Sequence, residues 1–94
     1  MFSFEKPFRM YNISIKPTAL KELEKVPKAY AIKIRNSIDK LAQDPRPPGV
    51  KKLKGTDENL YRVRFGDYRI IYSVEDEIQI IEVTRIGHRK YIYK

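Results

Sequence analysis

The chain has 94 residues and a formal net charge of +8, from 20 Lys and Arg against 12 Asp and Glu. This length suits one small domain with one modest core, so we expect residues 1–94 to fold as a single unit. Cysteine is absent, which excludes disulfides, thiolate zinc sites and cysteine nucleophiles.

Residues 1–9 contain three Phe but no continuous apolar run. They therefore predict neither a signal peptide nor a membrane-spanning helix, and we expect a cytoplasmic protein. We interpret them as an N-terminal extension, with Met10 as an alternative start. The excess of positive charge favours a polyanionic partner such as nucleic acid or the ribosome, although a basic surface can also serve solubility alone.

The first predicted elements are a strand and a helix. Tyr11–Ile15 alternates apolar and polar residues, the period of a half-buried strand. Pro17 then suits the first position of a helix, in which Leu20 and Leu23 form a short apolar stripe. Pro27 ends this helix.

A second helix follows, and its apolar residues recur at spacings of three and four. They are Ala31, Ile34, Ile38, Leu41 and Ala42. The proline-rich loop Asp44–Gly49 cannot continue the helix. The two helices are thus predicted to form an antiparallel hairpin.

After this loop the period changes to two. Tyr61, Val63 and Phe65 point to one face of a predicted strand, and Arg62 and Arg64 point to the other. Gly66-Asp67 is a candidate two-residue hairpin turn. Further strands are predicted at Tyr68–Val74 and Ile78–Ile86, joined by a polar turn at Glu75–Glu77 and ended by Gly87. We expect an α+β domain: an N-terminal strand at a sheet edge, a helical hairpin on one face, and a three-strand antiparallel meander.

The predicted meander gathers arginines on one face. A two-residue turn places Arg64 directly opposite Arg69, with Arg62 two residues away on the same face. Arg85 is expected near the end of the last strand. Such like-charge pairs are unfavourable unless an anion docks there, and guanidinium groups suit phosphate oxygens. The alternative is a solvated face whose arginines pair with Asp67 or Glu82.

Aromatic residues accompany this basic half of the chain. Tyr61, Tyr68 and Tyr72 share the core parity and are expected to pack inside. Tyr91 and Tyr93 lie in a polar tail, where a ring can stack on an RNA base.

The residues that several known catalytic mechanisms require are absent from the sequence. His88 is the only histidine, which excludes a paired-histidine ribonuclease mechanism and leaves His88 as either a surface residue or a catalytic one. No run of carboxylates has metal-binding spacing, and no glycine-rich phosphate loop is present, so we expect neither metal nor cofactor. An enzyme with this sequence must work by electrostatic stabilisation and by positioning RNA.

Three segments in fixed order resemble the signature of RelE/ParE-type toxins. They are KLKG at 52–55, LYRVRFGDYRIIY at 60–72 and IGHRK at 86–90, followed by Tyr93. The resemblance covers about residues 11–93. It implies the microbial ribonuclease fold of RelE and a toxin that cuts mRNA in the ribosomal A site, without metal, by attack of a ribose 2′-hydroxyl on the adjacent phosphate.

The resemblance also implies roles for particular residues. Arg69 and Arg89 are expected to stabilise the pentacovalent phosphate, Arg64 to stabilise charge, and Tyr93 to stack on the base. Basic residues around them are expected to bind RNA: Lys52, Lys54, Arg62, Arg85 and Lys90.

The chain departs from the best-known bacterial pattern, which has lysines at the positions of Arg62 and Arg64. Arginine stays protonated and cannot act as a general base. The base therefore stays open among His88, Lys52, Lys54 and the ribosomal RNA.

Such toxins pair with an acidic, RelB-like antitoxin that wraps the toxin, so the resemblance implies a hetero-oligomer. Two alternatives remain. One is a ParE-type toxin that binds DNA gyrase, and the other is an RNA-binding module without catalysis.

Overall fold

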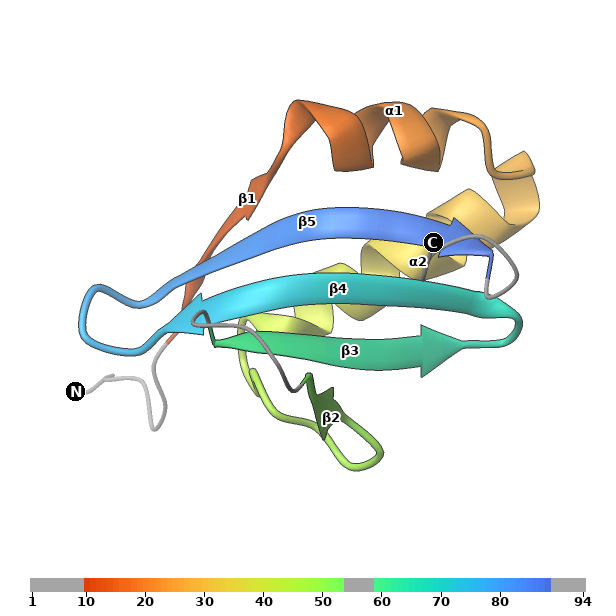
Figure 1. The fold of residues 1–94 in the computed structure, drawn as a ribbon. Helices are drawn as coiled ribbons and strands as arrows, with labels where there is room; N and C mark the ends of the chain where they lie inside the picture. Colours follow the sequence, from red (N-terminus) through yellow and green to blue (C-terminus); the bar gives the residue numbers. More distant parts are fainter. Residues whose placement is uncertain (1–9, 54–58, 89–94) are drawn as a thin grey trace, which may run out of the picture.

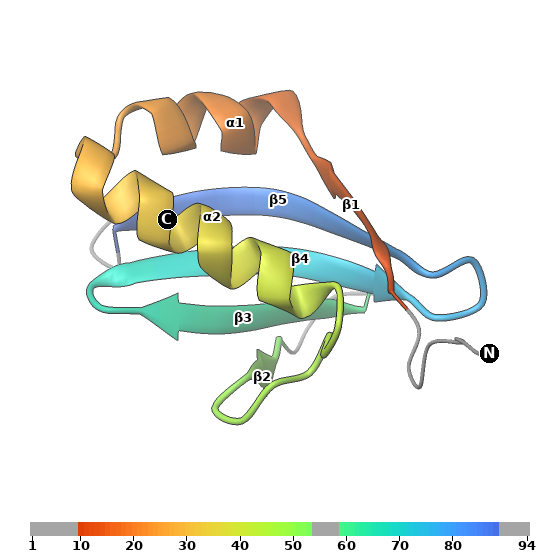
Figure 2. The same cartoon turned by 180° about the vertical axis from the view of Figure 1, so that it is seen from behind.

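The computed structural model describes residues 10–53 and 59–88 of the chain. Figure 1 shows a sheet with α1 (Pro17–Glu24) along its upper edge and α2 (Lys28–Leu41) behind it. Figure 2 shows α2 lying across the back of the sheet. The predicted α+β class is confirmed. No helix within these ranges is long and apolar enough to cross a membrane.

The sheet has five strands in the order β1-β5-β4-β3-β2. Their bounds are Asn12–Ile15 (β1), Lys51–Lys52 (β2), Leu60–Phe65 (β3), Tyr68–Glu75 (β4) and Ile80–His88 (β5). The first strand lies at an edge, as predicted, and pairs parallel with β5. The short β2 was not predicted, because two consecutive lysines carry no strand signal.

The two helices begin and end near the predicted prolines and loop. The first, α1 (Pro17–Glu24), has Pro17 at its N-terminus, and the chain turns back at Pro27 into α2. The prediction for Leu20 was wrong: Leu20 is 46% exposed, whereas Ala19 is fully buried. The helix is too short for a wide stripe, and Ala19 with Leu23 forms its buried face.

The core lies between α2 and the back of the sheet. Ile34, Ile38 and Leu41 of α2 are buried as predicted, and they meet the buried residues of β4 and β5. Ala42, which follows α2, is also buried, whereas Ala31 is only partly buried. The largest side chains with almost no exposed surface are Ile34, Ile38, Ile70, Tyr72, Val74, Ile81, Val83 and Ile86. Tyr61 and Tyr72 are buried and Tyr68 packs against the core, so their predicted core role is confirmed.

The hairpin between β3 and β4 has the predicted register. Gly66 has a φ of +59°, a conformation that few other residues adopt without strain, and Arg64 pairs with Arg69 across the ladder. The bounds of the last strand differ from the prediction. Gln79, with a φ of +55°, delays β5 to Ile80, and the strand continues through Gly87 to His88 because both pair with β4.

Candidate nucleic-acid interface

One face of the sheet carries no helix and holds the predicted arginines. Alternate residues of β4 point toward α2, so Arg69 points the other way, and its cross-strand partner Arg64 shares that side. Arg62, two residues before Arg64, points to the same side. We call these three residues the arginine face. The side of the sheet away from α2 faces the viewer in Figure 1.

Arg69 is in an unusual environment for a charged residue. It is only 8% exposed, and its Nε and Nη1 atoms are buried with no hydrogen-bond partner among the described residues. Arg64, directly opposite, is exposed and carries the same charge. A buried guanidinium without acceptors, beside a second arginine, is destabilising unless an anion supplies the missing oxygens.

The register of β2 separates two adjacent lysines. Lys51 pairs with Arg62, so its side chain lies on the side of the arginine face. Lys52, which the sequence favoured for RNA binding, pairs with Tyr61 and therefore points to the opposite side of the sheet. The sequence could not reveal this difference, since it depends on the register of a two-residue strand.

Arg85 lies within β5 and is held by an intramolecular partner. Its Nε donates to Glu22 Oε2 at 2.9 Å, and its Nη2 forms an ion pair with the same oxygen at 2.8 Å. Glu22 Oε1 also accepts a hydrogen bond from the Ile86 backbone N–H at 2.8 Å. This carboxylate on α1 raises the pKa of Arg85 above its ordinary value. Arg85 thus joins α1 to the edge of β5 in addition to lying near the arginines.

Four predicted site residues lie outside the described residues: Lys54, Arg89, Lys90 and Tyr93. Their predicted roles in RNA binding and catalysis stay predictions.

His88 lies on the side of the helices. Its ring meets Tyr68 edge-on with centroids 5.7 Å apart, and Tyr68 in turn contacts Tyr30 of α2 at 5.8 Å. The three rings surround a small hollow beside the Gly66 turn. This position is behind the sheet as seen from the arginine face, which argues against His88 as the general base there.

A cluster that the sequence did not predict anchors the proline-rich loop. Arg46 donates to both carboxylate oxygens of Asp76 at 3.3 and 2.8 Å and to Tyr61 Oη at 3.1 Å. Tyr11 Oη donates to the same carboxylate at 2.7 Å. The bond from Arg46, then that from Tyr11, lowers the pKa of Asp76 below its usual value.

A buried tyrosine reinforces this anchor. Tyr72 Oη donates to the Pro45 carbonyl at 2.7 Å, and burial raises the pKa of Tyr72. The loop that leads into β2 is therefore fixed at two points, and β2 then pairs with β3 so that Lys51 lies opposite Arg62.

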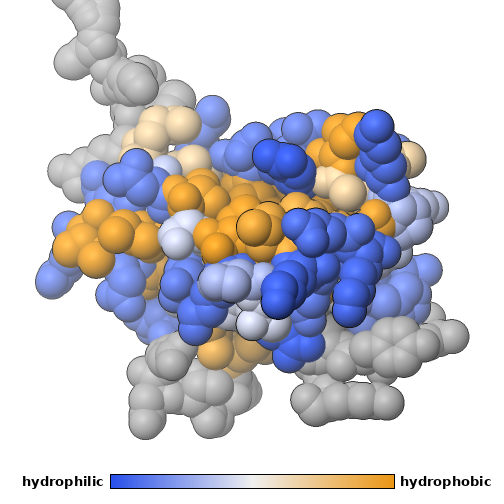
Figure 3. Space-filling model, turned by 90° about the horizontal axis from the view of Figure 1, so that it is seen from above, coloured by the Kyte–Doolittle hydropathy of each residue, from blue (hydrophilic) through white to orange (hydrophobic). Residues whose placement is uncertain are grey.

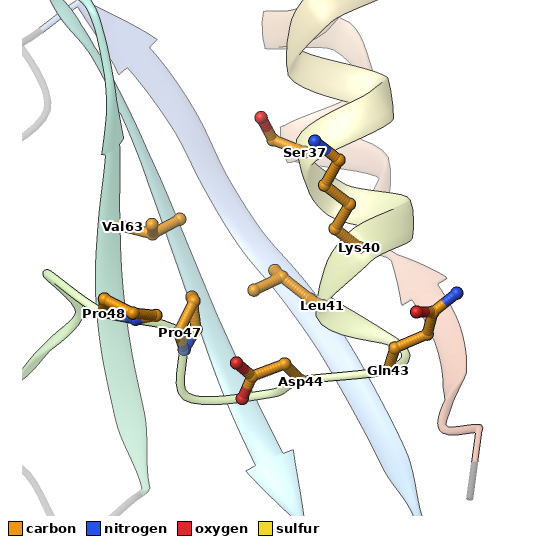
Figure 4. A pocket seen from close by; sticks show the side chains of 8 residues that line it. All are labelled: Ser37, Lys40, Leu41, Gln43, Asp44, Pro47, Pro48 and Val63. Atoms are coloured by element: carbon orange, nitrogen blue, oxygen red, sulfur yellow. The ribbon is translucent and has the colours of Figure 1, made fainter. Parts of the chain in front are cut away.

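The opposite side of the molecule has an apolar groove of about 450 Å³. In Figure 4 the end of α2, the proline-rich loop and β3 surround it, with Leu41, Pro47, Pro48 and Val63 among its lining side chains. A band of apolar residues also crosses the α1 side in Figure 3. Leu20 and Ile32 are 46% and 53% exposed.

Comparison with known proteins identifies the family of this chain. Residues 13–93 match the family described as the ParE toxin of the type II toxin–antitoxin system parDE. The chain belongs to the RelE/ParE family of type II toxins.

Its relatives carry RelE names. A Methanocaldococcus jannaschii protein named RelE1 is 36% identical over 89% of this chain and 96% of its own. The toxin RelE of Mycobacterium tuberculosis is 31% identical over 89% of this chain and 87% of its own. The archaeal RelE–RelB complex from Pyrococcus horikoshii superposes with a TM-score of 0.77 at 35% identity, covering 87% of this chain and 98% of that one.

Proposed function

We propose that this toxin is a ribosome-dependent, metal-independent endoribonuclease that cuts mRNA in the ribosomal A site. The observation that carries the proposal is Arg69, whose buried Nε and Nη1 have no acceptor among the described residues and which lies opposite the exposed Arg64. Two guanidinium groups held at one point by a rigid ladder suit a phosphate whose negative charge increases during reaction.

The reaction is transesterification within the RNA. The ribose 2′-oxygen attacks the adjacent phosphorus, and the bond to the 5′-oxygen breaks, which leaves a 2′,3′-cyclic phosphate and a 5′-hydroxyl. The 2′-hydroxyl loses a proton and the leaving oxygen gains one. Arg64 and Arg69 stabilise the charge of the pentacovalent phosphate, and neither removes the proton because arginine stays protonated. By family resemblance, Arg89 adds to this stabilisation and Tyr93 stacks on a base.

Neither an arginine nor His88 is the proposed proton acceptor, because arginine stays protonated and His88 lies behind the sheet. Lys54 and a group of the ribosomal RNA remain the candidates. Lys52 is less suited, because its register turns it away from the arginine face.

The proposed partner in the cell is an acidic, RelB-like antitoxin that forms a hetero-oligomer with the toxin. The complex from P. horikoshii supports this proposal, because that RelE is 35% identical to this chain and bound to RelB. Two features of the toxin suit a wrapping partner: the apolar groove beside α2 and the arginine face, which attracts acidic side chains.

Cleavage of mRNA on programmed ribosomes tests the proposal. The wild type is compared with Arg64→Ala and with Arg35→Ala, an exposed arginine of α2 that undergoes the same change in charge. We expect cuts in the A-site codon by the wild type and Arg35→Ala, and at least 100-fold slower cutting by Arg64→Ala (about 10²–10³ for loss of one charge-stabilising donor). Equal rates for all three proteins contradict the role of the arginine face.

Gyrase inhibition is the second candidate, because the matching family is described as ParE. A supercoiling assay separates the two functions: inhibited gyrase together with intact mRNA supports the ParE-type reading. RNA binding without any cleavage by the wild type supports a non-catalytic module.

A further inference from the structure

The side of the sheet that carries the arginine face has a second, chemically different end. A hollow of about 600 Å³ is lined by residues of β1, the start of β5 and the end of β4. These strand segments lie at the left of Figure 1. Its polar lining residues are Ser14, Lys16, Asn59, Ser73, Glu75 and Glu82. We call it the polar hollow.

The strand register places the polar hollow on the side of the arginines. Ser73 pairs with Glu82, which in turn pairs with Ser14, so the three side chains share one side of the sheet. Ser73 is four residues from Arg69 on β4, an even number, and therefore points the same way. At about 3.3 Å per residue the two positions are roughly 13 Å apart, a span that a short single strand of RNA covers.

The polar groups of the hollow are available to a ligand. Within the described part of the chain, no side-chain hydrogen bond or ion pair joins Glu75, Glu82 or Lys16 to another residue. Two carboxylates, two hydroxyls and an amide thus face one concave space. Its volume lies in the range of about 300–1,000 Å³ that is usual for small-molecule sites.

The charge of the polar hollow determines which part of an RNA strand it can bind. The carboxylates of Glu75 and Glu82 repel phosphate, which the arginine face attracts, so the hollow receives a base rather than the backbone. Carboxylate oxygens only accept hydrogen bonds, and an exocyclic amino group is the donor that they pair with on a base edge.

We propose that the polar hollow binds a base with an exocyclic amino group, and selects cytosine over uracil, in the RNA strand held by the arginine face. Glu82 is the central specificity residue, because it pairs with both Ser73 and Ser14. Uracil presents a carbonyl oxygen where cytosine presents its amino group, and this oxygen is repelled by the Glu82 carboxylate. The inference rests on the proposed function, since it requires RNA on the arginine face.

The test measures binding of two 2′-O-methyl oligomers of equal length, one of cytidine and one of uridine, at pH 7. Neither can be cut, because both lack the attacking hydroxyl. The wild type is compared with Glu82→Gln and with Glu77→Gln, an exposed residue outside the hollow that undergoes the same change in charge. We expect the wild type and Glu77→Gln to prefer the cytidine oligomer about five- to tenfold, and Glu82→Gln to lose that preference.

The other outcomes overturn the inference in distinguishable ways. Equal affinity of the wild type for both oligomers, lowered by Arg64→Ala, overturns the polar hollow and leaves the proposed function intact. A similar gain in affinity for both oligomers in Glu82→Gln and Glu77→Gln shows general charge repulsion only, and also overturns it. No binding of either oligomer by the wild type also overturns the inference, and the cleavage assay with Arg64→Ala on programmed ribosomes then decides the proposed function separately.

Discussion

Replacing Arg69 by methionine is expected to stabilise the protein while abolishing its activity. The side chain is 8% exposed, its buried Nε and Nη1 have no acceptor among the described residues, and Arg64 is directly opposite. Unsatisfied buried polar groups cost about 1–3 kcal/mol, and a like-charge cross-strand pair costs up to about 1 kcal/mol. Methionine has a similar length and removes both the unsatisfied polar groups and the like-charge pair.

After allowance for imperfect packing, we expect Arg69→Met to raise the free energy of unfolding by about 1–2 kcal/mol. For a domain of this size that is roughly 4–16 °C in Tm. The assay is thermal and urea denaturation of the purified toxin, with Arg85→Met as the matched control. Arg85 is paired with Glu22 at 2.8 Å, so the same substitution there is expected to lower the stability or leave it unchanged.

Cleavage on ribosomes is measured with the same proteins. Arg69→Met is expected to be stable and inactive, because the group that destabilises the free protein is the one that binds the reacting phosphate. An Arg69→Met protein that melts below the wild type refutes this reasoning, since it means that the guanidinium has a structural partner.

Three further predictions concern Lys51, Asp76 and Gly66. Lys51→Ala is expected to weaken RNA binding and to reduce the slope of log affinity against log salt concentration by about 0.7. Lys52→Ala, on the other side of the sheet, is expected to change neither quantity. Equal effects of the two substitutions would contradict the register of β2. Asp76→Asn is expected to lower stability near neutral pH. Because the folded-state pKa of Asp76 lies below its ordinary 3.8, the extra stability of the wild type is complete above pH 3.8 and is lost as the pH falls through the lowered pKa. A difference in Tm between the two proteins that does not change with pH would reject this role of Asp76. Gly66→Ala is expected to lower the free energy of unfolding by about 1 kcal/mol, measured by urea denaturation. The whole effect comes from the φ of +59°, because an added Cβ meets no atom within 4 Å. An unchanged free energy of unfolding would refute backbone strain at this position.

Local patterns predicted the elements whose residues carry a strong period or a turn signal. Gly66 fixed the hairpin, and the hairpin placed Arg64 opposite Arg69. The spacing in α2 likewise predicted its buried residues. The bounds of β5 could not be read, since they depend on a left-handed Gln79 and on pairing of Gly87 with Arg69.

Features set by contacts between distant residues were also missed. The Arg46–Asp76 pair joins residues 30 positions apart, and Glu22 reaches Arg85 across 63 positions. The sequence showed that Arg85 is basic, but only the packing of α1 on β5 shows its partner. In the same way, Lys51 and Lys52 are equivalent in the sequence and are separated only by the pairing of β2 with β3.

The most direct test of the central claim is the chemistry of the cut. Programmed ribosomes carry an mRNA in which each ribose of the A-site codon is replaced in turn by 2′-deoxyribose, and the ends of the cleavage products are identified. We predict one position at which the deoxy substitution abolishes cleavage, and a 2′,3′-cyclic phosphate at the end of the product from unmodified mRNA. Cleavage that persists at every substituted position, or products that end in a 5′-phosphate and a 3′-hydroxyl, contradicts attack by the 2′-hydroxyl on a phosphate held by Arg64 and Arg69.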